Sequence, residues 1–163
     1  MSTTSDQDHE FLRAVGEFTV RFAELESQLR TVIVALAGTT EAVGEVLTDT
    51  MSFTQLTDVY YGLCVHRASH AQLPARALRE RLHQLNARRN AMMYFAWAPD
   101  SAPPVVPRDW RATRASDILH WPARDAPLPA VLHAIAETVE VFNELVLVAK
   151  PALDTLAPQR PAQ

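Results

Sequence analysis

Several residue types are scarce in this chain, and their scarcity excludes certain kinds of site. The 163 residues include one cysteine, Cys64, which excludes an internal disulfide and a zinc site built from several cysteines. Four glycines are too few for a glycine-rich loop that cradles a phosphate group. The sequence contains no internal repeat and no low-complexity block. We therefore expect a site made of ordinary side chains, with no metal and no cofactor.

Signals for export or membrane insertion are also missing. The first residues, MSTTSDQDHEF, contain neither a basic segment nor an apolar one. No apolar run approaches the roughly 18 residues that a membrane-spanning helix needs. We therefore expect a cytoplasmic protein that does not associate with a membrane.

The remaining composition is that of an ordinary globular protein. Apolar residues make up 48% of the chain and charged residues 21%, which is too hydrophobic a balance for a disordered protein. A chain of this length can bury one sizeable core but is short for two domains. We predict one helical domain over residues 6–157, with a disordered tail at residues 1–5 and a frayed end at residues 158–163.

Charge is distributed unevenly beneath a net charge of −4. Residues 1–65 carry three arginines against ten acidic residues, whereas residues 66–114 carry nine arginines against three acidic residues. This asymmetry indicates either a face that binds a polyanion or an electrostatic fit between acidic and basic helices. Because arginine makes bidentate contacts with phosphate and no lysine cluster is present, RNA or a nucleotide is a candidate ligand.

Hydrophobic periodicity predicts an all-α fold with a long helix near each end of the chain. The first helix is expected to run from Ser5, a capping residue, to Gly38, a residue type that commonly ends helices. Its apolar positions alternate at steps of four and three: Phe11, Val15, Phe18, Phe22, Leu25, Leu29, Val32 and Leu36.

The last helix, expected over residues 128–156, has two apolar rows. Its main stripe consists of Leu128, Leu132, Ile135, Val139, Phe142, Val146, Ala149, Leu153 and Leu156. A second row consists of Val131, Val141, Leu145 and Val148. Together the two rows are wider than one neighbouring helix would cover. The excess indicates either a central position in the bundle or a homodimer surface.

Shorter helices are predicted between these two. One is expected over residues 41–47, and Ser52 with Gln55 matches the capping box that begins a helix from Phe53 to about Ala68. Pro74 suits the first position of the next helix, which ends near Trp97.

A proline- and arginine-rich arm is predicted over residues 98–125. Four prolines between residues 98 and 109 exclude a helix or a central strand there. Two short extended pieces, residues 110–113 and 118–121, leave room for a β-hairpin. The expected fold is therefore an up-down bundle of four to five helices with this arm before the last one.

The helix before the arm carries the most informative residues. Its apolar face consists of Leu78, Leu82, Leu85, Met92 and Ala96. Arg89 falls in the same stripe, and an anionic or acceptor-rich group must meet it, because burying an unpaired guanidinium costs several kcal/mol or more. Asn90, Tyr94 and Trp97 form a polar and aromatic line beside it. This end of the helix is a candidate site.

These residues resemble the signature of the bacterial HEPN-type proteins. Arg89, Asn90, Tyr94 and Trp97 give RNxxxYxxW, where the family has R-N-x-x-x-H-x-x-W, and the first helix contains FAELE. The likeness covers roughly residues 10–97 in motif order and the last helix in architecture. It implies a metal-independent endoribonuclease of toxin or defence type. Such a protein works as a dimer, with the two motifs facing each other across the interface.

The resemblance also implies roles for these residues. Arg89 would neutralise the phosphate during attack by the neighbouring 2′-hydroxyl, and Asn90 would orient the arginine or the substrate. The family's histidine would move the proton, but position 94 is tyrosine. A phenol with a pKa near ~10 is a poor general base, and losing such help removes about 10²–10⁴ in rate. We therefore expect weakened or lost cleavage, with RNA binding retained because Tyr94 can stack on a base.

Further RNA contacts are expected from arginines and one aromatic residue near the site. The expected RNA-binding residues are Arg88, Trp97, Arg76, Arg108 and Arg111. Four of the five have a structural alternative. Arg76, Arg79 and Arg81 often form no more than a solvated helix face, Trp97 often belongs to a core, and arginines of an arm often cover a surface loop.

Structural alternatives exist for the central residues too. A salt bridge from Arg89 to Glu24 or Glu26 would join two helices of the bundle. Asn90 would instead cap a loop or satisfy buried backbone. Cys64 is expected to be a small buried hydrophobic residue. Three histidines lack the spacing of metal ligands and are expected on the surface: His66, His70 and His83.

Two functions from different classes follow from the sequence. The first is a dimeric HEPN-like protein that targets RNA and has a weakened or inactive nuclease site. The second is a non-catalytic helical module, antitoxin-like or regulatory, that dimerises or binds a cognate antitoxin or other partner protein through its last helix. Nucleotide binding through Arg89 is a third.

Overall fold

Five helices make up the part of the chain that the structure describes. This computed structural model describes the backbone of residues 3–68, 71–95 and 128–156, and the side chains of residues 9–68, 71–92 and 128–156. The helices are α1 (Thr3–Ala37), α2 (Glu41–Thr48), α3 (Phe53–Arg67), α4 (Gln72–Phe95) and α6 (Leu128–Asp154), and no strand occurs within these ranges. The predicted all-α bundle is confirmed. The arm at residues 98–125, with its expected hairpin, lies outside the described residues.

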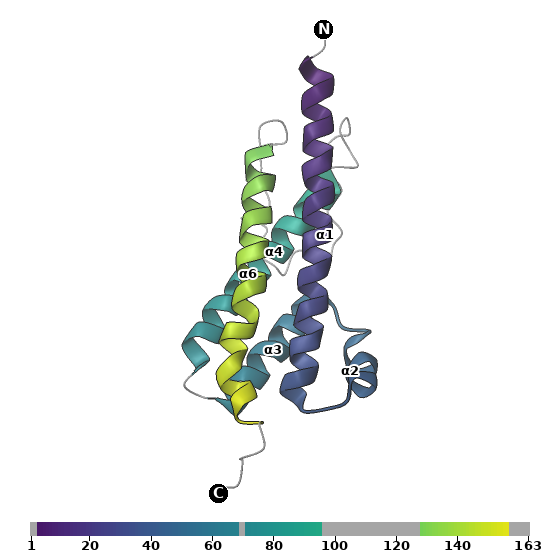
Figure 1. The fold of residues 1–163 in the computed structure, drawn as a ribbon. Helices are drawn as coiled ribbons and strands as arrows, with labels where there is room; N and C mark the ends of the chain where they lie inside the picture. Colours follow the sequence, from purple (N-terminus) through teal and green to yellow (C-terminus); the bar gives the residue numbers. More distant parts are fainter. Residues whose placement is uncertain (1–2, 69–70, 96–127, 157–163) are drawn as a thin grey trace, which may run out of the picture.

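The two long helices α1 and α6 form the front of the bundle. Figure 1 shows them side by side and running in the same direction, with α3 and α4 crossing behind them. α6 contacts α1, α3 and α4, whereas α2 packs against the lower part of α1. The last helix therefore packs against three other helices, which accounts for part of its wide apolar face.

Local signals in the sequence explain where α3 begins and where α1 ends. The Ser52 hydroxyl accepts a hydrogen bond from the Gln55 amide at 3.3 Å, and the Gln55 side-chain oxygen accepts one from the Ser52 amide at 2.8 Å. This is the predicted capping box, which satisfies two amides that the helix itself leaves without partners. Gly38 follows α1 with a φ of 68°, a left-handed conformation that glycine adopts without strain.

Two predicted helix starts differ from the structure. α1 begins at Thr3, so it includes the expected capping residue Ser5 and part of the expected tail. α4 begins at Gln72, which places Pro74 within the first turn and not at its first position. Proline is tolerated in both places because the first amides of a helix have no partner inside it.

The core lies between α1, α3, α4 and α6 and contains the stripes expected for the earlier helices. All of the α1 stripe is buried except Phe11, which is partly buried. In α4, Leu78, Leu82 and Leu85 are fully buried. Cys64 is also fully buried, as predicted. Burial raises the pKa of its thiol to about 11, against a smaller lowering by a hydrogen bond with Tyr60.

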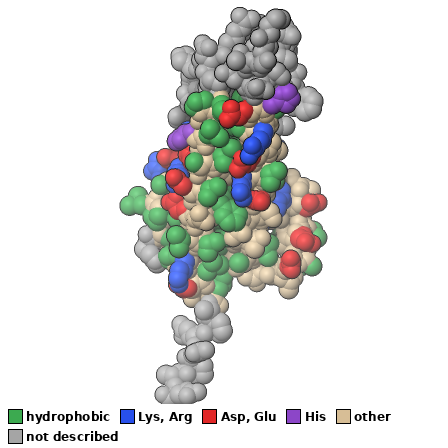
Figure 2. All heavy atoms as spheres, turned by 45° about the horizontal axis from the view of Figure 1, so that its top comes forward, with side chains coloured by type: hydrophobic (Ala, Val, Ile, Leu, Met, Phe, Trp, Pro, Cys, Tyr) green, Lys and Arg blue, Asp and Glu red, His purple; other side chains and the backbone are tan. Residues whose placement is uncertain are grey.

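The last helix buries the row that the sequence treated as the second one. The buried residues of α6 are Val131, Ala134, Thr138, Val141, Leu145, Val148, Ala149 and Ala152. Three residues of the expected main stripe are instead exposed: Leu132 at 48%, Val139 at 42% and Val146 at 41%. Ala134 and Thr138, which belong to neither predicted row, are also buried there. Figure 2 shows apolar side chains exposed between charged ones on one face of the molecule.

Candidate functional site

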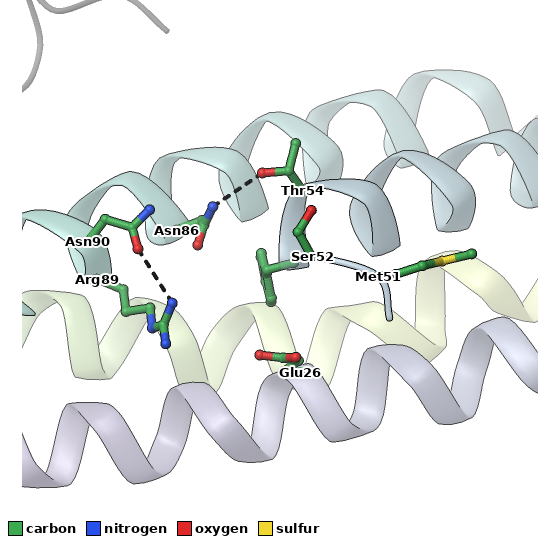
Figure 3. A pocket seen from close by; sticks show the side chains of 8 residues that line it. Glu26, Met51, Ser52, Thr54, Asn86, Arg89 and Asn90 are labelled. Carbon is green, nitrogen blue, oxygen red and sulfur yellow. Dashed lines mark hydrogen bonds between the residues drawn. The ribbon is translucent and has the colours of Figure 1, made fainter. Parts of the chain in front are cut away.

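The candidate site is an open hollow where α1, α4 and the start of α3 meet (Figure 3). Its volume is about 410 Å³, and its lining consists of Glu26, Met51, Ser52, Phe53, Thr54, Asn86, Arg89 and Asn90. In Figure 3, Arg89 reaches from α4 toward α1, and Glu26 on α1 faces the same space. The structure thus brings two of the predicted site residues, Arg89 and Asn90, into one hollow.

An aromatic pair holds the Arg89 guanidinium in place. Its Cζ atom lies 5.3 Å from the centroid of the Phe22 ring, within the range of a cation–π contact. Phe22 is 2% exposed and packs on Phe53, with 4.6 Å between the ring centroids. The Arg89 Nη1 atom also donates a long hydrogen bond of 3.4 Å to the side-chain oxygen of Asn90. These contacts orient the guanidinium without neutralising its charge.

Every other arginine of α4 is paired with a carboxylate. The pairs are Arg76 with Glu80, Arg79 with Asp58, Arg88 with Glu137, and Arg81 with Glu137, Glu140 and Glu144. For Arg89, no carboxylate among the described side chains lies within 4.0 Å. Most of the basic charge of α4 is therefore balanced by acidic residues of α3 and α6. Among the arginines of α4, and with only the described side chains considered, Arg89 is the exception.

The expected alternative for Arg89, a salt bridge to the first helix, is wrong. Glu24 pairs with Arg21 at 3.1 Å, and Glu26 pairs with Arg30 at 2.8 Å. Each of these bonds joins neighbours on α1, three or four residues apart, so both carboxylates have their ionic partner on their own helix. The groups that the structure places against Arg89 are the Phe22 ring and the side-chain oxygen of Asn90, and neither is an anion.

The other predicted site residues are not brought to the hollow by the described part of the structure. Arg88 is bound to Glu137 on α6, and Arg76 forms an exposed pair with Glu80. Tyr94 belongs to α4, but its side chain is not among those described. Three further predicted RNA-binding residues lie outside the described residues: Trp97, Arg108 and Arg111.

The hollow also contains residues that the sequence did not single out. Asn86 precedes Asn90 by one helical turn, and its side-chain amide donates to the Thr54 hydroxyl at 3.3 Å. The four-residue spacing of the two asparagines was visible in the sequence. The approach of Ser52 and Thr54 from α3 was not, because it depends on how α3 packs against α4.

The histidines take different positions. His66 is exposed, His83 lies 3.2 Å from Asp58 through its Nε2 atom, and His70 is outside the described residues. Among the side chains that the structure describes, no three metal-ligating residues gather in one place.

We compared the chain with protein-family models, curated proteins and solved structures. None of them matches it. Among the described helices, none has both the length and the apolar character needed to span a bilayer. Function is therefore argued from the site.

Proposed function

We propose that this chain is a HEPN-like RNA-targeting protein of toxin or defence type, with a weakened or inactive nuclease site. The observation that carries the proposal is the lack of a described anionic partner for Arg89. It faces an open hollow, and no described carboxylate pairs with it, whereas the other arginines of α4 are all paired. A guanidinium held in this way offers its planar donors to a phosphate group.

In this proposal Arg89 binds a phosphate of the RNA backbone, and Asn90 steadies the arginine through the hydrogen bond between them. During cleavage, the arginine would offset the charge that builds on the phosphate oxygens when the 2′-hydroxyl attacks. Tyr94 would occupy the position of the family's histidine. A phenol does not accept that proton at neutral pH. We therefore expect the protein to bind RNA but to cleave it weakly or not at all.

We also propose that two copies form the working unit, in the cytoplasm. Support for a second copy comes from α6, where Leu132, Val139 and Val146 repeat at intervals of seven residues and are exposed. A stripe of this spacing follows one side of a helix and suits contact with another helix. Leu147, 68% exposed, widens it.

RNA binding tests the proposal directly. A salt titration with structured RNA should show affinity that falls steeply as salt rises, because phosphate contacts release counterions. Arg89→Ala should weaken binding by about 10-fold to 100-fold, the effect of losing a charge-assisted hydrogen bond. Arg79→Ala removes the same charge from the same helix, at a residue paired with Asp58, and should change affinity much less. Equal effects of the two variants would contradict a specific role for Arg89.

Cleavage tests the proposed ancestry of the site. The unmodified chain and Tyr94→His are incubated with structured RNA without metal, and the products are resolved on a gel. An imidazole near pKa ~6.5 is matched to proton transfer at neutral pH, so the variant should cut faster by about 10²–10⁴. A folded Tyr94→His variant that does not cut would argue against a degenerate nuclease.

A second candidate function is a helical interaction module that binds a second copy, a cognate antitoxin or another partner protein. The exposed apolar stripe of α6 favours it. Tight self-association or complex formation together with no RNA binding at any salt concentration would support this function over the first.

A further inference from the structure

We propose that the hollow reads guanine, with Glu26 as the residue that selects it. This inference rests on the proposed function, because it assumes that Arg89 holds an RNA phosphate in the same hollow. Glu26 and Arg89 come from two packed helices, α1 and α4, and both line the hollow. A ligand in the hollow would meet the Arg89 cation and the Glu26 anion together. It therefore needs an acidic group for Arg89 and an edge that donates hydrogen bonds to Glu26.

Arg30 fixes the position of the Glu26 carboxylate. Its Nη2 atom donates to Glu26 Oε1 at 2.8 Å and to the Met51 carbonyl at 3.3 Å, and its Nη1 atom donates to the Thr48 carbonyl. The guanidinium therefore ties Glu26 to the chain segment that connects α2 with α3. No described residue donates to Glu26 Oε2, and each carboxylate oxygen has more than one acceptor direction. The carboxylate is oriented in advance and still has acceptor capacity for a ligand.

Among the four RNA bases, guanine fits such a carboxylate best. Its Watson–Crick edge carries two adjacent donors, the N1 hydrogen and the N2 amine, which match the two oxygens of one carboxylate. Adenine and cytosine each place one amine beside an acceptor nitrogen, and uracil places its one donor between two acceptors. Each of these would direct a lone pair at the Glu26 carboxylate, and two acceptors facing each other repel.

The other lining residues are compatible with one nucleotide. The volume of about 410 Å³ lies at the small end of the roughly 300–1,000 Å³ range of ligand pockets, which suits a single unstacked nucleotide. Asn86 is oriented by Thr54, so its side-chain oxygen is free to accept a further hydrogen bond from the ligand. Arg89 takes the phosphate, and Glu26 takes the base.

Five short RNAs of the form UUXUU, with X as guanine, adenine, cytosine, uracil or inosine, test the inference by fluorescence anisotropy. The unmodified chain should bind the guanine RNA about 10-fold to 100-fold more tightly than the adenine, cytosine and uracil RNAs. The inosine RNA, which lacks only the N2 amine, should fall between. Glu26→Gln should reduce the preference for guanine to within about 3-fold. The matched control is Glu24→Gln, at a carboxylate of the same helix paired with Arg21, and it should keep the preference.

The possible results separate this inference from the proposed function. Arg89-dependent binding without preference for guanine, or a preference that persists in Glu26→Gln, overturns the role of Glu26 and leaves the proposed function standing. Absence of RNA binding, or binding that Arg89→Ala does not change, overturns both. If Glu26→Gln fails to fold by circular dichroism, the inosine RNA decides, because it changes the ligand and not the protein. Equal affinity for the inosine and guanine RNAs would then overturn the inference.

Discussion

Gly44 of α2 lies close against Val34 of α1. A Cβ atom at this position would lie 2.2 Å and 2.7 Å from the two Cγ atoms of Val34, closer than side chains in proteins approach. Gly44→Ala should therefore push α2 away from α1 and lower the free energy of unfolding by about 1–3 kcal/mol, as overpacking does. Thermal unfolding measures the change. Adding Val34→Ala should restore part of the lost stability, and a double variant no more stable than Gly44→Ala would contradict this explanation.

At Gly16 and Gly62 the same substitution, glycine to alanine, should raise stability and not lower it. Both lie inside helices, and an added Cβ at either position would meet no atom within 4 Å. Because alanine loses less backbone entropy than glycine when a helix forms, each Gly→Ala change should raise the free energy of unfolding by about 0.5–1 kcal/mol. A loss of stability at these positions would show that the effect at Gly44 is not steric.

At the scale of single residues, the sequence was informative about Arg89 and about one of its neighbours. Its place in the apolar stripe predicted a guanidinium that needs a partner, and Glu26 was one of two acidic residues of the first helix considered for that role. Glu26 lines the same hollow, although it pairs with Arg30 and not with Arg89. The contact with the Phe22 ring was not predicted, because the period of a helix does not say which residue of another helix lies opposite.

One acidic residue of α3, Asp58, makes polar contacts with two residues of α4. Asp58 accepts a hydrogen bond of 2.7 Å from Arg79, and His83 lies 3.2 Å away. Arg79 also lies over the Tyr61 ring, with 5.4 Å from its Cζ atom to the ring centroid. Burial would raise the pKa of Asp58, but the hydrogen bonds and charges of Arg79 and His83 outweigh it and lower that pKa below its ordinary value.

This lowered pKa predicts part of the acid sensitivity of the fold. A carboxylate with a lower pKa in the folded state contributes stability above its unfolded pKa of about 3.9, and the contribution is lost as pH falls through the folded pKa. Asp58→Asn should therefore lower stability slightly at pH 7 and flatten the dependence of stability on pH below about pH 5. Urea unfolding at several pH values measures both. Parallel curves for the two proteins would contradict the assignment.

At the scale of helices, the sequence predicted which segments are helical better than which faces are buried. Strong signals at Ser52 and Gly38 placed helix ends correctly, because capping depends on local residues. In α6 periodicity ranked the longer apolar row first, but the shorter row is the one that is wholly buried. With α6 turned this way, the acidic residues Glu137, Glu140 and Glu144 meet arginines of α4.

At the scale of the whole molecule, three apolar residues of α6, Leu132, Val139 and Val146, are exposed, and self-association is the corresponding prediction. Val139→Asp combined with Val146→Asp should convert a homodimer into a monomer, because both residues are already more than 40% exposed in one copy and would become buried only in the dimer. Analytical ultracentrifugation should give twice 18.1 kDa for the unmodified chain and 18.1 kDa for the variant.

A matched control for this experiment lies at the start of α4. Leu73 is 79% exposed and away from α6's stripe in sequence and in helix, so Leu73→Asp should leave the mass unchanged. A monomeric unmodified chain would remove the second copy from the proposed function and leave the RNA-binding test of Arg89 as its support.

The parallel arrangement of α1 and α6 has a consequence for how the chain acquires this shape. Their contact joins the first and the last of the described helices, so most of the polypeptide separates the partners in sequence. Such contacts of high sequence separation slow folding, because a long loop must close before the contact stabilises anything. During synthesis, the apolar stripe of α1 lacks its most extensive contact until α6 has been made, and apolar surface exposed in this way is prone to aggregation.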